Sequence, residues 1–284
     1  PEVKKDDYIY SDGTTILGAD DKAGLAAILE TIHSIKEHQL SHGQIQFVIT
    51  AGEESGLLGI KATDTNLLDA DFGYAVDASK DVGTTVIGAP TQVKIYTTIK
   101  GKTAYASTPS KGISAINIAS KVISRMNLGQ VDALTTANIG KFHVGSATNI
   151  VADEVVLEAE ARSHNEESIE RQVQHMKDTF EMTASEYGGE AQVVIEKSYQ
   201  GFKVNENDKV TQIAKASALA LGLKGDTCIA GGGSDGSIMN QYGIPSVVLG
   251  VGYENIHTTS ERVSTKDLYM LANQLLKIIE LVTE

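Results

Sequence analysis

Apolar residues in the first part of the chain recur at helical and then at strand spacing. After Gly18-Ala19 they fall at steps of three and four, which predicts a helix with one apolar face. The members of that face are Leu25, Ile28, Leu29, Ile32 and Ile35. Short apolar runs at 44–51 and 73–77 predict two strands. This alternation of helices and strands is typical of an α/β domain, which we expect over residues 1–89.

The spacing changes beyond residue 89. Residues 93–99 alternate between apolar and polar, as in a strand with one face in water. The elements expected next are a helix near 113–127, strands at 134–143 and 153–162, a helix at 166–187 and a strand near 191–197. The order β-α-β-β-α-β is that of a ferredoxin-like sandwich. We therefore predict an inserted domain at 90–201.

The α/β pattern returns at about residue 202. The expected elements are a helix at 206–221, a short strand around 227–229, a buried strand at 244–250 and a final helix. That last helix opens with Ser264-Thr265-Lys266-Asp267, which has the form of a capping box. The predicted fold class is α/β, in which residues 1–89 and 202–284 form one domain around the insertion.

The composition of the chain excludes several classes of partner and of covalent structure. The net charge of −13 argues against nucleic acid as a partner, because phosphate binding needs a basic face. No apolar run approaches the ~18 residues of a membrane span, so we expect no membrane association. The lone Cys228 excludes an internal disulfide and fits a cytoplasmic protein. The first residues, PEVKKDDYIYSDG, resemble the middle of a domain and do not begin with Met. We therefore expect an N-terminal segment before Pro1.

Acidic residues follow the predicted strands, and one histidine accompanies them. Glu53-Glu54 come after 44–51, and Asp77 ends 73–77, where open α/β sheets bind ligands. Asp20 stands at a helix start, and His257 follows a buried strand. One imidazole with three or four carboxylates suits two divalent cations that share a bridging carboxylate.

Each of these residues also has an ordinary structural explanation. Asp20 fits a helix cap, Glu53-Glu54 a solvated turn, and His257 a hydrogen-bonded loop residue. Two adjacent glutamates nevertheless repel each other unless something positive separates them. One could bind a cation while its neighbour takes a proton from a metal-bound water. Asp77 has the stronger case, since unpaired burial behind an apolar strand is costly.

Two other motifs point to different chemistry. Residues 232–236 match G-x-S-x-G, the nucleophile elbow of serine hydrolases. Its acid and imidazole partners would all have to come from the short segment 254–261, so we rank it below the metal site. Residues 101–103 resemble the end of a phosphate loop, but Tyr96 occupies a position that requires glycine.

Six motifs together resemble the peptidase T branch of the M20 co-catalytic metallopeptidases. In chain order they are LGADDKAG, TAGEESG, YAVD, GKTAYASTP, GGGSDG and IHTTSERV, and they cover essentially the whole chain. The resemblance implies a zinc-exopeptidase-like three-layer catalytic domain with an inserted ferredoxin-like lid or dimerisation domain. It also implies a homodimer that forms through the lid.

The resemblance assigns the metal-site roles. Asp20 would bridge two metals, with Glu54 and His257 completing one site and Asp77 binding the other. Glu53 would be the general base and acid. A cis peptide is implied at Asp20-Asp21. We expect Zn²⁺, although carboxylate-rich sites also accept Co²⁺ or Mn²⁺.

The resemblance also implies substrate contacts. Arg162 resembles an arginine that receives a substrate carboxylate, and Asn149 matches a polar substrate contact. Gly232-Gly233 would let the backbone approach the substrate. Tyr105 stands where the family has a histidine that stabilises the oxyanion, so it would donate a hydrogen bond but no charge.

The sequence departs from the family pattern at two further points. None of its seven histidines begins an H-x-D motif, so the metal at Asp77 would lack an imidazole. We expect that motif upstream of Pro1. Val144 occupies a position that is usually glycine.

The implied activity is removal of the N-terminal residue from a short peptide. An N-acyl amino acid deacylase or a carboxypeptidase of the same superfamily remains an alternative, because both would bind a free carboxylate through Arg162. A non-catalytic dimeric module is the other alternative, since Tyr105 and the absent imidazole both weaken the chemistry.

Overall fold

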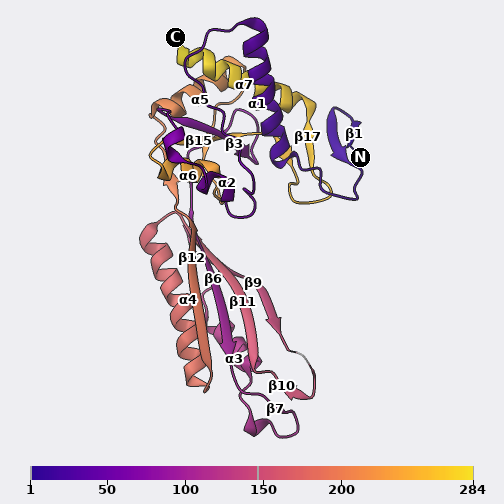
Figure 1. The fold of residues 1–284 in the computed structure, drawn as a ribbon, viewed down its shortest axis with the longest axis vertical. Helices are drawn as coiled ribbons and strands as arrows, with labels where there is room; N and C mark the ends of the chain where they lie inside the picture. Colours follow the sequence, from indigo (N-terminus) through magenta and orange to yellow (C-terminus); the bar gives the residue numbers. More distant parts are fainter. Residues whose placement is uncertain (1, 146, 284) are drawn as a thin grey trace. The chain divides into compact units, whose positions relative to one another are not determined.

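The computed structural model describes residues 2–145 and 147–283 (Figure 1). The chain forms two compact units, one made of Pro1–Ala89 with Phe202–Glu284 and the other of Pro90–Gly201. Among the described residues, every helix is too short or too polar to cross a membrane.

The first unit is built around a four-stranded sheet of order β14-β4-β15-β3. Its strands are β3 (Gly73–Ala78), β4 (Thr85–Val86), β14 (Thr227–Cys228) and β15 (Ser246–Gly250). The pairs β15–β3 and β14–β4 are parallel, whereas β15–β4 is antiparallel. The helices are α1 (Ala19–His38), α2 (Leu58–Lys61), η1 (Thr65–Leu67), α5 (Lys209–Ala220), α6 (Asp235–Gln241) and α7 (Thr265–Thr283).

Successive residues of β15 face two different layers of helices. Val247 and Leu249 are fully buried in a cluster to which α1, α5 and α7 contribute. Val248 faces the other way, toward Gly236 of α6. Because neighbouring side chains of a strand point to opposite faces, the sheet is covered on both sides. The predicted α/β class is confirmed.

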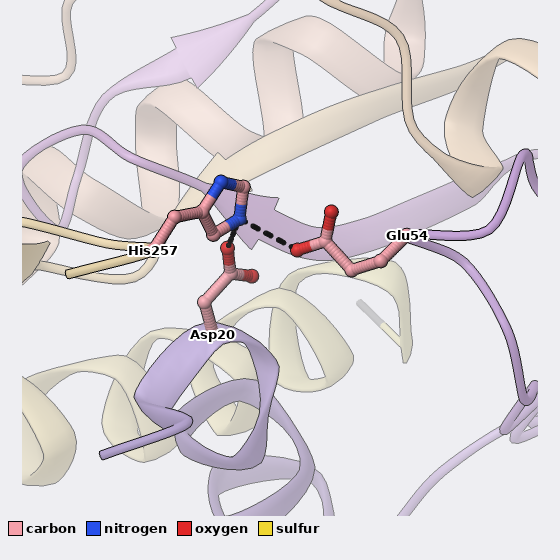
Figure 2. Close-up of side chains that lie close together, drawn as sticks. All are labelled: Asp20, Glu54 and His257. Atoms are coloured by element: carbon pink, nitrogen blue, oxygen red, sulfur yellow. Dashed lines mark hydrogen bonds and ion pairs between the residues drawn. The ribbon is translucent and has the colours of Figure 1, made fainter. Parts of the chain in front are cut away.

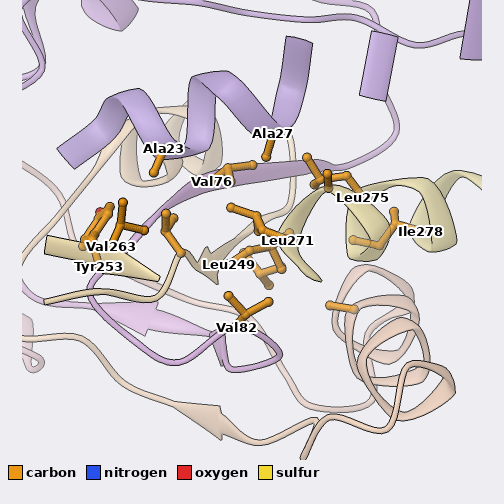
Figure 3. Packing of buried hydrophobic residues seen from close by; sticks show 14 of the residues in the cluster. Ala23, Ala27, Val76, Val82, Leu249, Tyr253, Val263, Leu271, Leu275 and Ile278 are labelled. Carbon is orange, nitrogen blue, oxygen red and sulfur yellow. The ribbon is translucent and has the colours of Figure 1, made fainter. Parts of the chain in front are cut away.

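Helix α1 begins where the sequence predicts, and its buried face overlaps the predicted apolar face only in part: Ile35 is buried and Ile28 packs against the core. Ala23, Ala27 and Thr31 are buried, whereas Leu29 is 53% exposed, so its predicted place on the buried face is wrong. A methyl group at Gly24 would lie 2.3 Å from the carbonyl oxygen of Val76 in β3. The helix lies so close to β3 that small side chains fill the space between them (Figure 3).

Residues 44–51 do not form the predicted strand. No described strand pairs with this segment; instead the Gln44 and Gln46 side chains donate to the carbonyl oxygens of Asp69 and Leu67. Phe47, within the segment, is 41% exposed. An apolar segment forms a strand only beside another strand with which it exchanges backbone hydrogen bonds. No described strand lies beside residues 44–51 in this way.

Two smaller sheets complete the first unit. Strands β1 (Glu2–Lys5), β2 (Tyr8–Ser11), β17 (Arg262–Ser264) and β16 (Tyr253–Glu254) form an antiparallel sheet in that order. Strand β5 (Gly88–Ala89) pairs antiparallel with β13 (Phe202–Lys203). The second pairing places the points where the chain leaves and re-enters the first unit side by side.

The second unit has a five-stranded antiparallel sheet of order β12-β6-β11-β9-β8, with two helices on one face (Figure 1). Its main elements are β6 (Thr91–Lys100), α3 (Ala115–Arg125), β8 (Gly129–Asp132), β9 (Thr135–Val144), β11 (Glu154–Ser163), α4 (Glu166–Glu186) and β12 (Glu190–Tyr199). The shorter elements are β7 (Ala104–Tyr105), η2 (Pro109–Lys111) and β10 (Ile150–Val151). The long elements follow the predicted β-α-β-β-α-β order, so the ferredoxin-like sandwich is confirmed.

Helix α4 anchors the core of the second unit through Phe180, which is completely buried. Truncation to alanine (Phe180→Ala) removes the ring and leaves a cavity, so we expect the free energy of unfolding to fall by about 3–5 kcal/mol. Urea titration followed by circular dichroism measures this loss. Met182, on the same helix, is 71% exposed, and Met182→Ala should change stability by no more than about 0.5 kcal/mol. Equal losses in both variants would contradict the assigned packing.

Candidate metal centre

The sheet brings the candidate residues together at one edge. Strands β3 and β15 run parallel, so their carboxyl ends lie at the same edge. Asp77 lies near the end of β3, and β15 leads through β16 into the turn that carries His257. Asp20 lies at the start of α1, and Glu54 lies in the turn just before α2.

Asp20, Glu54 and His257 converge on one point (Figure 2). The Nε2 atom of His257 lies 2.7 Å from Glu54 Oε1 and 3.1 Å from Asp20 Oδ2. One ring nitrogen carries at most one proton, which cannot point fully at two acceptors. One ligand atom from each residue lies within 4.8 Å of the others, a spacing at which a shared cation can satisfy all three.

Asp20 lies in the irregular first turn of α1, and its carboxylate contacts His257. The Asp20-Asp21 peptide bond is cis, as expected, and both residues have non-helical dihedral angles. Asp21, not Asp20, caps the first turn, because its Oδ1 accepts the Gly24 N–H at 3.1 Å. The explanation of Asp20 as an ordinary helix cap is therefore wrong.

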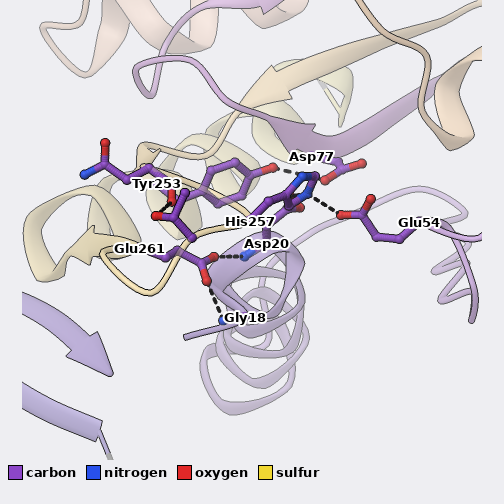
Figure 4. A network of polar contacts seen from close by, with 9 residues as sticks. Gly18, Asp20, Glu54, Asp77, Tyr253, His257 and Glu261 are labelled. Atoms are coloured by element: carbon purple, nitrogen blue, oxygen red, sulfur yellow. Dashed lines mark hydrogen bonds and ion pairs between the residues drawn. The ribbon is translucent and has the colours of Figure 1, made fainter. Parts of the chain in front are cut away.

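Asp77 lies beside this cluster and is hydrogen-bonded to a tyrosine. The Tyr253 hydroxyl donates to Asp77 Oδ1 at 3.0 Å (Figure 4). Burial, followed by repulsion from Asp21 and Glu53, raises the pKa of Asp77 to about 9. Burial is also the largest cause that raises the pKa of Asp21 to about 8.

Repulsion also raises the pKa values of two other carboxyl groups, those of Asp20 and Glu53. Burial and the charge of Glu54 raise the pKa of Asp20, and the same two causes raise the pKa of Glu53 to about 7. Carboxyl groups that oppose each other's ionisation in this way favour a cation among them. The donor set therefore fits divalent cations.

Glu261 is a functional candidate that the sequence reasoning missed. Its side chain is buried, and its Oε2 and Oε1 accept the N–H groups of Gly18 and Asp20 at 2.6 and 3.0 Å (Figure 4). In the sequence, Glu261 stands out only as a possible acid partner of the serine motif at 232–236. Its place four residues after His257 was the signal that could have pointed to it.

The glycine-rich motif at 232–236 forms the N-terminus of helix α6. The Ser234 side chain is buried and accepts the Gly236 N–H at 3.2 Å, while its own N–H donates to Ser237 Oγ at 3.4 Å. This is a capping box at the start of α6. The serine caps a helix, and Gly232-Gly233 precede it in the connection from β14.

Three further predicted residues belong to the second unit. Tyr105, in β7, is 70% exposed. Asn149 accepts the Ala106 N–H through its carbonyl at 2.9 Å. Arg162 lies in β11, and its Nε donates to Glu160 at 2.8 Å. The substrate contacts of these three residues stay predictions.

Carboxylates and an imidazole at the carboxyl ends of parallel strands define a candidate metal-centre enzyme with an α/β fold. The model of peptidase family M20/M25/M40 matches residues 3–281. The chain belongs to this family, and its relatives place it in the peptidase T-like branch. It is a hydrolase of the peptidase class.

Two solved structures and one sequence relative support the assignment to the peptidase T-like branch. A tripeptidase from Staphylococcus aureus subsp. aureus Mu50 is 68% identical, with a TM-score of 0.96, and the match covers 100% of this chain and 76% of that one. Aminopeptidase PepT from Bacillus cereus ATCC 10987 is 50% identical, with a TM-score of 0.90 and coverage of 100% and 76%. Peptidase T of Geobacillus kaustophilus is 29% identical over 96% of this chain and 67% of its own length.

His257 should titrate above its ordinary pKa of 6.5 in metal-free protein, mainly because Glu54 accepts its hydrogen bond. The stabilisation from the protonated ring is complete below 6.5 and is lost as pH rises through the raised pKa. NMR of the ring protons after chelation measures the midpoint. Glu54→Gln should lower it, whereas Glu37→Gln on the exposed face of α1 should not. A midpoint at or below 6.5 would contradict the geometry.

Proposed function

We propose that the protein is a metal-dependent exopeptidase that removes the N-terminal residue of short peptides, as a tripeptide aminopeptidase does. The observation that carries the proposal is the convergence of Asp20, Glu54 and His257 from three separate segments. Membership in the M20 family supports it, as does the similarity to a tripeptidase and to PepT.

Asp20 would bridge two divalent cations. Glu54 and His257 would complete the ligands of one cation, and Asp77 would bind the other. Zn²⁺ suits this mixture of imidazole and carboxylate, and Co²⁺ or Mn²⁺ would also fit. When bound, such cations polarise a carbonyl group and lower the pKa of water.

Glu53 would transfer the proton. Burial and its carboxylate neighbours raise the pKa of Glu53 to about 7, which suits a group that gains and loses a proton near neutral pH. It would take a proton from the attacking water and pass it to the nitrogen of the leaving product. Hydrolysis would proceed without a covalent enzyme intermediate.

The second unit would supply contacts to the substrate. Arg162 would receive a substrate carboxylate, and Glu160 holds its Nε while Gln92 holds Glu160. Asn149 and the exposed Tyr105 of the second unit would contact the peptide, as would Gly232-Gly233 of the first unit.

A homodimer would form through the second unit. The support is strand β12, which lies at the edge of its sheet, and the 62% exposure of Val194 in that strand. Light scattering of Val194→Lys, compared with the unchanged protein, tests this surface.

Glu53→Gln keeps the shape of the side chain but removes the base. We expect kcat to fall by about 10²–10⁴-fold while bound metal is unchanged. Stopped assays with a tripeptide measure the rate, and elemental analysis measures the metal. Glu37→Gln, which changes an exposed glutamate of α1, is the matched control and should keep full activity.

Chelation provides the complementary test. Removing metal should abolish hydrolysis, and Zn²⁺, Co²⁺ or Mn²⁺ should restore it. Loss of turnover in Ser234→Ala together with indifference to chelators would favour serine chemistry instead. Fewer than one tightly held ion per chain and no hydrolysis would favour a non-catalytic module.

Arg162→Gln should selectively weaken the use of substrates with a free carboxylate. A charged hydrogen bond contributes about 1.5–3 kcal/mol, so kcat/KM for a tripeptide acid should fall by about 10- to 100-fold. The tripeptide amide should be hydrolysed equally by both forms. Equal losses on acid and amide would contradict the role of Arg162. Faster turnover of an N-acyl amino acid than of the tripeptide would favour the deacylase alternative.

A further inference from the structure

Two turns from distant parts of the sequence must keep a fixed position relative to each other if their side chains are to bind the same cation. One carries Asp20 and the other carries His257. A hydrogen bond from Asp20 N–H to Glu261 Oε1 joins residues 241 positions apart, and the Gly18 N–H binds the second oxygen. Figure 4 shows Glu261 between the Gly18–Asp20 turn and the loop of His257.

The site of Glu261 calls for a carboxylate. Its side chain is 1% exposed, and two backbone N–H groups from alternate residues meet its two oxygens. Glutamine would offer one acceptor and would turn an NH₂ group toward the second donor. Aspartate is one methylene shorter, so it could not reach both N–H groups from the same backbone position.

Glu261 is tied to the histidine turn through its own backbone. Its N–H donates to the carbonyl oxygen of Thr258 at 3.2 Å, and Thr258 directly follows His257. On the other side, the carboxylate holds the stretch from Gly18 to Asp20, where Gly18 has a φ of 70° and Asp20 is non-helical. The link therefore runs from the His257 turn to the backbone that aims the Asp20 carboxylate.

We propose that Glu261 is a positioning residue that sets the spacing between Asp20 and His257 and thereby the affinity of the centre for divalent cations. The inference rests on the proposed function in that the centre must bind such cations. Glu261 acts on the centre through the backbone of residues 18–20. Groups of this kind typically change metal affinity by about 10- to 100-fold.

The experiment compares Zn²⁺ affinity in unchanged protein and in Glu261→Gln. Isothermal titration with Zn²⁺ should show affinity lower by about 10- to 100-fold in the variant. Absorption spectra of the Co²⁺ forms should differ, because the ligands move relative to each other. Circular dichroism should show that the folded state is retained.

Glu254→Gln is the matched control. Glu254 lies in β16, at the other end of the same loop, and its carboxylate binds Arg262 Nε at 2.8 Å and the Tyr8 hydroxyl at 3.2 Å. This change loosens the loop without removing a bond to residues 18–20. We expect Zn²⁺ affinity and the Co²⁺ spectrum to match those of the unchanged protein.

Each outcome is decisive. Equal Zn²⁺ affinity in unchanged protein and Glu261→Gln overturns the inference alone, whereas absence of Zn²⁺ binding in unchanged protein overturns the proposed function. A loss of affinity in Glu254→Gln as large as in Glu261→Gln also overturns the inference. If Glu261→Gln does not fold, Glu261→Asp is titrated by the same criterion. Failure of both to fold, with Glu254→Gln folded, assigns Glu261 a purely structural role.

Discussion

The crowding of carboxyl groups at the carboxyl end of the sheet is the constraint on which the first unit depends. Burial is the largest cause that raises the pKa values of Asp21, Glu53 and Asp77, and each of these groups has at least one other carboxyl among the further causes. A folded pKa above the unfolded one means that stability falls as pH rises through that interval. For Asp77 the interval runs from 3.8 to about 9. A cation that binds only the folded chain offsets this loss, so the same ligand would complete the chemistry and stabilise the fold.

Periodicity predicted most of the second unit, because each of its long strands pairs with another long strand and its two helices pack on the same sheet. It failed at 44–51 and at Leu29 of α1 for reasons that the spacing of apolar residues does not show. A strand needs a partner ladder, and none of the described residues provides one beside 44–51. The buried face of α1 is selected by the close approach of Gly24 to Val76, which favours alanine over leucine.

Residues that would act through their side chains on a ligand could be found in the sequence, since their types and spacing are characteristic. Asp20, Glu54 and His257 meet as expected. Glu261 is harder to find in that way, because it binds the N–H groups of the backbone, and its place four residues after His257 is the one signal of it in the sequence. Tyr253 was not predicted as a site residue for a related reason. Its ring packs in the core like other apolar side chains, and only its hydroxyl binds Asp77.

The β5–β13 pairing has a consequence for how such chains are assembled. Ala89 faces Phe202 across two short antiparallel strands, so the whole of Pro90–Gly201 is attached through two adjacent points. A module connected in this way can be removed and its stumps joined by a tight turn without disturbing the host sheet. Genetic exchange can therefore replace the insertion while the residues of the host unit stay in place.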